Sequence, residues 1–226
     1  MKGLWLHRTG KQKLIIFCNG WGMDEHPFQP LSSSEYDVYM LCDYHDLIPQ
    51  EPLENIAHGY RQVSLISWSM GVWVGQKLFS DLAWDFHSTI AVNGTLYPID
   101  DDLGIPEKIF SETLSGFDET NRMKFYRRMC REKTNLKMFL MRQPKRSADE
   151  QRAELAALEK NIENIAVEQS IYRKIIIAEY DWVIPSANQR RFWSGRQTTE
   201  IAGFHFLFYL WPSWDQLLQL DSALHI

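Results

Sequence analysis

Short apolar runs rich in β-branched residues recur along the chain, and they limit the folds that it can adopt. These runs occupy residues 13–17, 36–41, 63–67, 88–92, 174–178 and 198–201. Each has the length of a buried strand, and most of the intervening stretches are long enough for a crossover helix. Strands joined by such crossovers lie parallel in one sheet. The sequence therefore predicts an α/β fold in which helices flank a mostly parallel central sheet.

The start of the chain suggests a different connection. Residues 4–7 form another short apolar run, and Thr9, Gly10 and Lys11 lie between it and the run at 13–17. A short connection that contains glycine is typical of a β-hairpin. We therefore expect these first two strands to pair with each other.

The strand pattern is interrupted once, between residues 98 and 169. This segment carries helix signals and no convincing strand, and it includes a capping box formed by Ser147 and Glu150. A length of 226 residues suits one domain with an insertion. We expect residues 1–97 and 170–226 to form an α/β core and residues 98–169 to form a helical lid.

Composition argues against several functional classes. Hydrophobic residues make up 45% of the chain, enough for a large core, but no run of 18 apolar residues could span a membrane. The N-terminal apolar stretch is too short for a signal peptide. Cys18, Cys42 and Cys130 lack zinc or redox spacing, so we expect reduced thiols in a cytoplasmic protein without a metal. The acids at 100–102 are more typical of a solvated loop than of a cation site.

The net charge of −5 argues against nucleic-acid binding, but it hides one strongly basic segment. Residues 122–146 contain ten Lys or Arg and one acid, a local charge of +9, so the remainder carries −14. Lys124, Arg127, Arg128 and Arg131 recur at helical spacing and fall on one helix face. Charged helix faces are usually only solvated, yet such a concentration also suits a partner of opposite charge.

Ser69 lies in a sequence typical of a nucleophile elbow. The pentapeptide at residues 67–71, SWSMG, follows a predicted strand directly and precedes a helical pattern at 72–82. The sharp turn of an elbow needs small residues two positions before and after the nucleophile, and Ser67 and Gly71 meet that need. Taken alone, the pentapeptide also fits an ordinary strand-to-helix turn.

A glycine-rich segment, Asn19-Gly20-Trp21-Gly22, follows the predicted strand at 13–17. Hydrolases with a serine elbow place their first oxyanion loop at this position, and the second donor is the amide after the nucleophile. We therefore expect the backbone N–H groups of Trp21 and Met70 to form an oxyanion hole. The alternative is a plain glycine turn.

Asp181 and His205 complete the pattern. Asp181 follows the run at 174–178, and His205 follows the run at 198–201. The order Ser, Asp, His, each on a loop after a strand, is that of the α/β-hydrolases. The carboxyl ends of parallel strands meet at one edge of a sheet, so we expect Ser69, Asp181 and His205 to form a catalytic triad.

Beyond these motifs, much of the chain resembles one family, the BioG type of pimeloyl-[acyl-carrier protein] methyl ester esterase. Asn19 and Ser67, where the wider α/β-hydrolases often have His and Gly, both fit this family. The similar segments are NGWG at 19–22, DYHDL at 43–47, SWSMGVWV at 67–74, AVNGT at 91–95, GIP at 104–106, RMKFYRRMC at 122–130 and ANQ at 187–189.

The resemblance implies a cytoplasmic enzyme of biotin biosynthesis that hydrolyses the methyl ester of pimeloyl-[acyl-carrier protein] and releases methanol without a cofactor. Acyl carrier proteins are acidic, so Lys124, Arg127, Arg128 and Arg131 would dock one. We expect Trp68, Phe125 and Phe139 to line the acyl pocket, and we expect a monomer.

Two other functions fit the same residues. The first is a thioesterase or general short-chain esterase, because the triad sets the reaction class and the pocket sets the substrate. The second is a catalytically silent hydrolase fold that binds a carrier protein. The intact set of Ser69, Asp181 and His205 argues against this second function.

Overall fold

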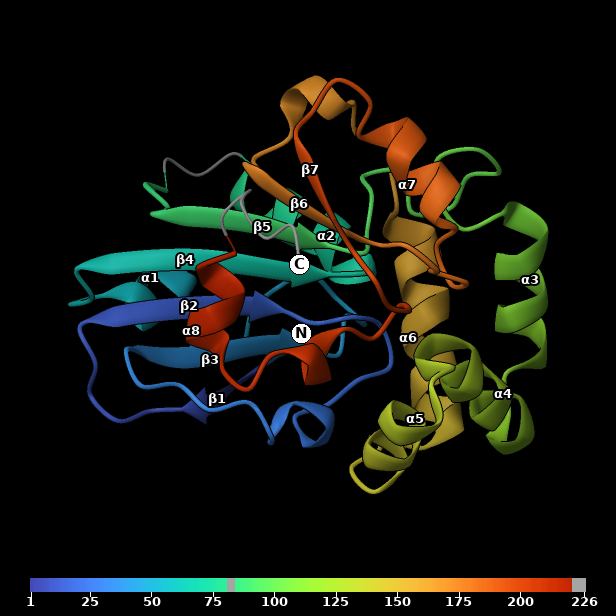
Figure 1. Cartoon of the computed structure of the whole chain (residues 1–226), viewed down its shortest axis with the longest axis horizontal. Helices are drawn as coiled ribbons and strands as arrows, with labels where there is room; N and C mark the ends of the chain where they lie inside the picture. Colours follow the sequence, from blue (N-terminus) through green and yellow to red (C-terminus); the bar gives the residue numbers. More distant parts are fainter. Residues whose placement is uncertain (81–83, 221–226) are drawn as a thin grey trace.

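The computed structural model describes residues 1–80 and 84–220, and its centre is a seven-stranded sheet (Figure 1). The strand order is β1-β3-β2-β4-β5-β6-β7, and every pairing is parallel except that of β1 with β3. This confirms the predicted α/β fold class. The strands are β1 Lys2–His7, β2 Lys13–Cys18, β3 Tyr36–Cys42, β4 Gln62–Trp68, β5 Ser88–Val92, β6 Lys174–Ala178 and β7 Thr198–Ile201.

The helices connect these strands and cover both faces of the sheet. They are α1 Leu53–Ala57, α2 Met70–Phe79, α3 Glu107–Gly116, α4 Glu119–Cys130, α5 Lys133–Leu140, α6 Ala148–Asn161, α7 Ser186–Phe192 and α8 Trp214–Leu218. Three short 3-10 helices lie at His26–Phe28, Val167–Gln169 and Phe208–Leu210. The helical pattern at 72–82 corresponds to α2, and its residues 81 and 82 lie outside the described residues.

The predicted hairpin of the first two strands is wrong. β1 pairs antiparallel with β3, where Leu4 lies opposite Met40, while β2 lies between β3 and β4. The run in β2 is fully buried from Leu14 to Cys18, which suits a central strand, whereas β1 is only half-buried and suits an edge. The connection between the two strands therefore carries the chain from the edge, past the position of β3, to β2 on the other side of β3.

Alternating side chains of the strands enter two hydrophobic cores, one on each face of the sheet. Leu14 and Ile16 of β2 belong to the core that α1 and α2 cover. Ile15 and Phe17 belong to the core that α8 and the 3-10 helix at 208–210 cover. This alternation follows from the two-residue period of a strand, and it explains why β2 is apolar throughout.

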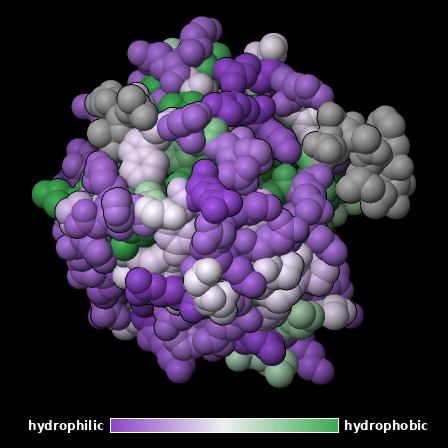
Figure 2. Space-filling model, turned by 90° about the vertical axis from the view of Figure 1, so that its left-hand side faces the viewer, coloured by the Kyte–Doolittle hydropathy of each residue, from purple (hydrophilic) through white to green (hydrophobic). Residues whose placement is uncertain are grey.

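Four helices, α3 to α6, lie between β5 and β6 in the chain and gather at the end of the sheet toward which the parallel strands point (Figure 1). The capping box of Ser147 and Glu150 opens α6 as predicted. The opposite end of the molecule presents mainly hydrophilic residues (Figure 2). No helix within residues 1–80 and 84–220 is long and apolar enough to cross a bilayer. The lid boundaries at 98 and 169 stay a prediction.

Asp37 fixes the turn between β1 and β2. Its side chain is 1% exposed, and its carboxylate accepts hydrogen bonds from the amides of Thr9, Gly10 and Lys11 and from the hydroxyl of Tyr60. Burial alone would raise the pKa of Asp37, but these four donors outweigh burial and hold the pKa below its usual value.

We expect Asp37→Asn to lower the free energy of unfolding near neutral pH by about 2 kcal/mol, because buried amides lose their acceptor. The folded-state pKa is depressed, so this contribution is present above the unfolded pKa and is lost as pH falls through the folded pKa. Urea titrations of both proteins near neutral pH and at about pH 3 measure it. An equal difference in the free energy of unfolding between the two proteins at both pH values would contradict the role of the carboxylate. Glu35→Gln, which removes a half-exposed carboxylate bonded to Lys13, is the control and should change little.

Candidate active site

Ser69 forms a sharp turn between β4 and α2. Its backbone has φ 58° and ψ −127°, in a region that residues other than glycine rarely adopt. Ser69 is also the N-cap residue of α2, but its side chain makes no capping hydrogen bond. The hydroxyl is therefore available to a partner across the site.

Small residues on either side of Ser69 allow this turn. A Cβ at Gly71 would lie 2.3 Å from the carbonyl oxygens of Cys18 and Asn19, so α2 can start against the end of β2 only with glycine there. Ser67 is fully buried, and a Cβ at Gly75 would lie 2.6 Å from its Oγ. The two small positions that the sequence pattern requires are thus explained by close packing.

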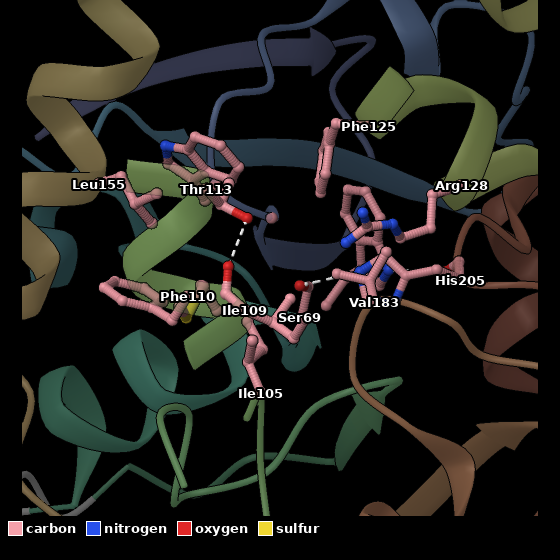
Figure 3. Close-up of a pocket in the computed structure, with 14 residues that line it drawn as sticks. Ser69, Ile105, Ile109, Phe110, Thr113, Phe125, Arg128, Leu155, Val183 and His205 are labelled. Carbon is pink, nitrogen blue, oxygen red and sulfur yellow. Dashed lines mark hydrogen bonds between the residues drawn. The ribbon is translucent and has the colours of Figure 1, made fainter. Parts of the chain in front are cut away.

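Ser69, His205 and Asp181 form one chain of hydrogen bonds. His205 Nε2 lies 2.9 Å from Ser69 Oγ, and His205 Nδ1 lies 2.7 Å from Asp181 Oδ2 (Figure 3 shows the first of these bonds). The three side chains are buried. They follow β4, β6 and β7, as the sequence predicts. This arrangement can transfer a proton from the serine to the imidazole while the carboxylate holds the ring.

Further groups fix the acid. Asp181 Oδ1 accepts the amides of Val183 and Ile184 at 2.8 and 3.0 Å, and Oδ2 also accepts Gln189 Nε2 at 2.8 Å. Three donors besides the histidine stabilise the carboxylate and restrict its rotation. Sequence reasoning assigned no role to Gln189, although it lies in the family-like segment at 187–189.

Asn93 fixes the histidine loop. Its side-chain oxygen accepts the amide of Ala178 at 2.7 Å, and its side-chain nitrogen donates to the carbonyl of His205 at 2.9 Å. Trp68 Nε1 donates to the same carbonyl at 3.0 Å. Asn93 therefore ties the end of β6 to the backbone that carries the imidazole. Its place in the family-like segment at 91–95 was the available signal, and its role was missed.

The segment at 19–22 lies against the elbow. A Cβ at Gly20 would lie 2.7 Å from the ring of Trp68 and 3.3 Å from Ser69 Cβ, so the backbone here packs directly beside the serine. The backbone amides of Trp21 and Met70 donate no hydrogen bond to another group in the described part of the chain. Both residues line the cavity above Ser69. Their role as oxyanion donors stays a prediction.

The cavity at Ser69 is narrow and mostly apolar. Its volume is about 30 Å³, and Figure 3 shows it between Phe125 and Arg128 on one side and Phe110 and Leu155 on the other. An apolar cavity with a few polar groups suits an acyl chain. The lining residues are Gly20, Trp21, Trp68, Ser69, Met70, Ile105, Ile109, Phe110, Thr113, Phe125, Arg128, Leu155, Val183 and His205.

Two of the three predicted pocket residues line this cavity. Trp68 and Phe125 do, but Phe139 does not, so that prediction is wrong. Phe139 is fully buried, with its ring 4.9 Å from that of Tyr126 and 5.1 Å from that of Phe206. The reason is that α5 packs against the Tyr126 side of α4, whereas Phe125 faces the cavity.

The part of the wall that α3 supplies was missed. Ile109, Phe110 and Thr113 are spaced by one and three residues, so they share one face of the helix, and Leu155 of α6 joins them. Helical spacing of apolar residues was the signal. The sequence does not say which of several amphipathic helices covers the serine.

The basic face of α4 divides into two parts. Lys124, Arg127 and Arg131 are exposed, while Arg128 is half-buried and lines the cavity at Ser69. All four also line an outer groove of about 800 Å³, and the guanidinium of Arg131 lies 4.2 Å from the ring centre of Trp182.

The outer groove continues into the cavity. Ile109, Arg128 and Val183 line both, so they form the connection between the groove and the serine. The remaining groove residues are Pro106, Leu136, Trp182 and Pro185. A linear ligand could therefore lie along basic and aromatic side chains outside and reach Ser69 with its end.

Other potentially reactive groups are already engaged or buried. Within the described residues, Asp24, Glu25 and His26 bring ligand atoms within 4.8 Å of one another, but the Asp24 carboxylate accepts the amides of His26 and Lys145. Burial raises the pKa of the Cys18 and Cys42 thiols to about 12, so both stay protonated near neutral pH.

Comparison with known proteins identifies the family. A family profile described as Pimeloyl-ACP methyl esterase BioG matches residues 1–217. The chain belongs to the BioG family. An uncharacterized protein of Haemophilus influenzae is 33% identical over 209 residues, which cover 91% of this chain and 94% of that protein. The predicted family resemblance is thereby confirmed.

A second relative is longer. A malonyl-[acyl-carrier protein] O-methyltransferase of Bacteroides fragilis is 34% identical over 183 residues, which cover 81% of this chain and 37% of that protein. The BioG chain thus matches little more than a third of the length of this relative. The relative's name describes a protein that extends far beyond the shared segment.

Solved structures agree on the fold. The crystal structure of BioG from Haemophilus influenzae has a TM-score of 0.87 at 32% identity, and the match covers 96% of this chain and 100% of that one. An enol-lactonase of Burkholderia xenovorans has a TM-score of 0.63 at 14% identity and covers 90% and 88% of the two chains. The second similarity shows the fold alone. Membership of the BioG family supports esterase-type hydrolase activity.

We expect Gly71→Ala to destabilise the protein by more than about 3 kcal/mol, because its Cβ would meet fixed backbone oxygens. Thermal or urea unfolding of purified protein measures the loss. Gly116→Ala is the matched control. At Gly116 the nearest atom to an added Cβ is 3.7 Å away, and alanine should leave stability equal or slightly higher. Similar stability of the two variants would contradict the close approach of α2 to β2.

Proposed function

We propose that this BioG chain hydrolyses the methyl ester of a pimeloyl group held on an acyl carrier protein, and that it releases methanol. The observation that carries the proposal is the hydrogen-bonded chain of Ser69, His205 and Asp181 at an apolar cavity. Membership of the BioG family favours this substrate.

The first step is attack by Ser69 on the ester carbonyl carbon. His205 Nε2 accepts the hydroxyl proton as the bond to carbon forms, and Asp181 accepts the hydrogen bond of Nδ1–H. The carboxylate thereby selects the tautomer with a free Nε2 lone pair, and its charge stabilises the imidazolium that forms.

The developing oxyanion would be stabilised by the amides of Trp21 and Met70. Both residues line the cavity and neither amide donates elsewhere in the described part of the chain. A donor of this kind is worth about 3 kcal/mol in the transition state. Collapse of the intermediate breaks the bond to methoxide, which leaves as methanol with the proton from His205. Water then attacks the acyl-serine by the same route and restores Ser69.

The outer groove suits a substrate that arrives on a long prosthetic arm. Its mouth carries Lys124, Arg127 and Arg131, and its inner end reaches the cavity through Arg128. An acidic carrier would dock at these cations, and its arm would lie along the groove. The name of the Bacteroides relative also describes chemistry on a carrier-bound acyl group. A cytoplasmic location and a monomeric state stay predictions from the sequence.

Ser69→Ala tests the proposal directly. We expect wild-type protein to release methanol from pimeloyl-carrier-protein methyl ester, and the variant to lose at least about 10³-fold in kcat. Mass spectrometry of the carrier measures the loss of the methyl group. The matched thioester reaction, release of free acid from the carrier, is followed in the same samples. Cleavage of the thioester with the methyl ester intact would replace the methyl esterase by a thioesterase, and equal rates in Ser69→Ala would refute the serine mechanism.

Arg127→Glu tests docking. We expect KM for the carrier-bound ester to rise about tenfold, with hydrolysis of a small p-nitrophenyl ester unchanged, because Arg127 is exposed and does not line the cavity. Arg152→Glu on α6 is the control with the same charge change and should leave both substrates unaffected. Arg128 is not used for this test, because it lines the cavity and its substitution would change the hydrolysis of both substrates. An equal rise in KM for Arg127→Glu and Arg152→Glu would overturn specific docking.

A further inference from the structure

Helix α6 holds the glycine-rich loop at residues 19–22. Gln151 Nε2 donates to the carbonyl of Gly22 at 2.6 Å, and the amide of Gly22 donates to Glu154 Oε2 at 3.1 Å. The indole Nε1 of Trp21 donates to the backbone carbonyl of Gln151 at 2.6 Å. Three hydrogen bonds thus join one turn of α6 to the two residues that follow Gly20.

Glu154 is a buried carboxylate that also reaches the other end of this loop. Its side chain is fully buried, and its Oε1 accepts the amide of Tyr44 at 2.9 Å. The hydroxyl of Tyr44 donates to the carbonyl of Asn19 at 2.9 Å. Glu154 therefore contacts Gly22 directly and Asn19 through Tyr44.

Arg146 compensates the buried charge of Glu154. The guanidinium of Arg146 lies 2.5 Å from Glu154 Oε2 and 3.0 Å from Asp43 Oδ1. A buried carboxylate is costly unless it is paired and fully hydrogen-bonded, and two main-chain amides plus one arginine meet that condition here. An apolar residue at 154 would leave the amides of Gly22 and Tyr44 without an acceptor.

The loop lies so close to the serine that a small shift would matter. Gly20 packs against Ser69 and the ring of Trp68, and Trp21 is the next residue. The amide of Trp21 must face the oxyanion with hydrogen-bond geometry, and an error of about 1 Å in such a position can cost about 100-fold in rate. The contacts of α6 with Trp21 and Gly22 fix the position of the Trp21 amide relative to Ser69.

We propose that Gln151 and Glu154 are positioning residues for ester hydrolysis, which hold the Trp21 amide at the oxyanion position through the loop at 19–22. The inference rests on the proposed function, in which that amide is an oxyanion donor. The inserted helices then contribute to transition-state stabilisation as well as covering the cavity. Sequence patterns did not indicate this positioning role, because polar residues such as Gln151 and Glu154 are typical of the exposed face of a helix.

The test compares Glu154→Gln with Asp43→Asn. Both remove one carboxylate from Arg146, but only Glu154 contacts the loop. Asparagine also tolerates the φ of 61° at position 43. For a p-nitrophenyl short-chain ester, we expect Glu154→Gln to lower kcat at least about tenfold with KM within about twofold. Asp43→Asn should keep both within about twofold of wild type.

A trifluoromethyl ketone separates positioning from a loss of fold. This inhibitor forms an oxyanion on Ser69, so its Ki should rise in Glu154→Gln by about the same factor as kcat/KM falls. A purely structural role would lower the unfolding temperature and leave kcat and Ki of the folded protein unchanged. Gln151→Met keeps side-chain volume and the backbone carbonyl but removes the bond to Gly22, and it should show the same correlation even if Glu154→Gln does not fold.

Equal losses of kcat in Glu154→Gln and Asp43→Asn would overturn the inference, and so would folded Glu154→Gln and Gln151→Met variants with wild-type kcat. Failure of the proposed function looks different. If the wild-type protein hydrolyses the small ester but not the carrier-bound ester, the proposed substrate is refuted. The kcat and Ki values of the variants on the small ester then still decide whether Gln151 and Glu154 are positioning residues. Hydrolysis of the small ester by Ser69→Ala at the wild-type rate would refute the serine mechanism and this inference with it.

Discussion

The close approach of α2 to the end of β2 is the contact on which the rest of the site depends. Because the first turn of α2 lies against the carbonyl oxygens of Cys18 and Asn19, the chain must reverse direction within one residue, at Ser69. The strained backbone of that residue is stable because buried strand and buried helix fix it from both sides. The same approach brings Met70 and the loop at 19–22 to the cavity at Ser69.

Around this turn, hydrogen bonds of buried polar side chains hold the site, and most of them involve the main chain. Asn93 joins β6 to the carbonyl of His205, Gln189 and two amides restrain Asp181, and Glu154 restrains the loop beside Ser69. Each of these side chains is buried, so each bond is made in a low-dielectric surrounding and an unmade bond would be costly. The result is a set of candidate catalytic groups whose positions are determined before a substrate binds.

Local sequence patterns were sufficient where one residue's environment decides the outcome. The strands were predicted within one or two residues at each end, because buried β-branched runs are a local property, and the capping box of Ser147 was predicted for the same reason. The order of Ser69, Asp181 and His205 on loops after strands also sufficed to bring them together, since parallel strands end at one edge. The predicted hairpin of the first two strands is wrong, because a short connection does not determine which strand pairs with the first one.

The sequence by itself therefore determined the fold class, the positions of the strands, the family and the three residues that form the hydrogen-bonded chain Ser69, His205 and Asp181. Only the tertiary structure decided which helix faces surround them. Phe139 turned into the core beneath α4, and Arg128 turned inward while Arg127 stayed exposed. Gln151 and Glu154 form hydrogen bonds with a loop that lies about 130 residues earlier in the chain. The physical reason is that helical periodicity identifies a face, whereas the partner of that face depends on how distant segments pack together.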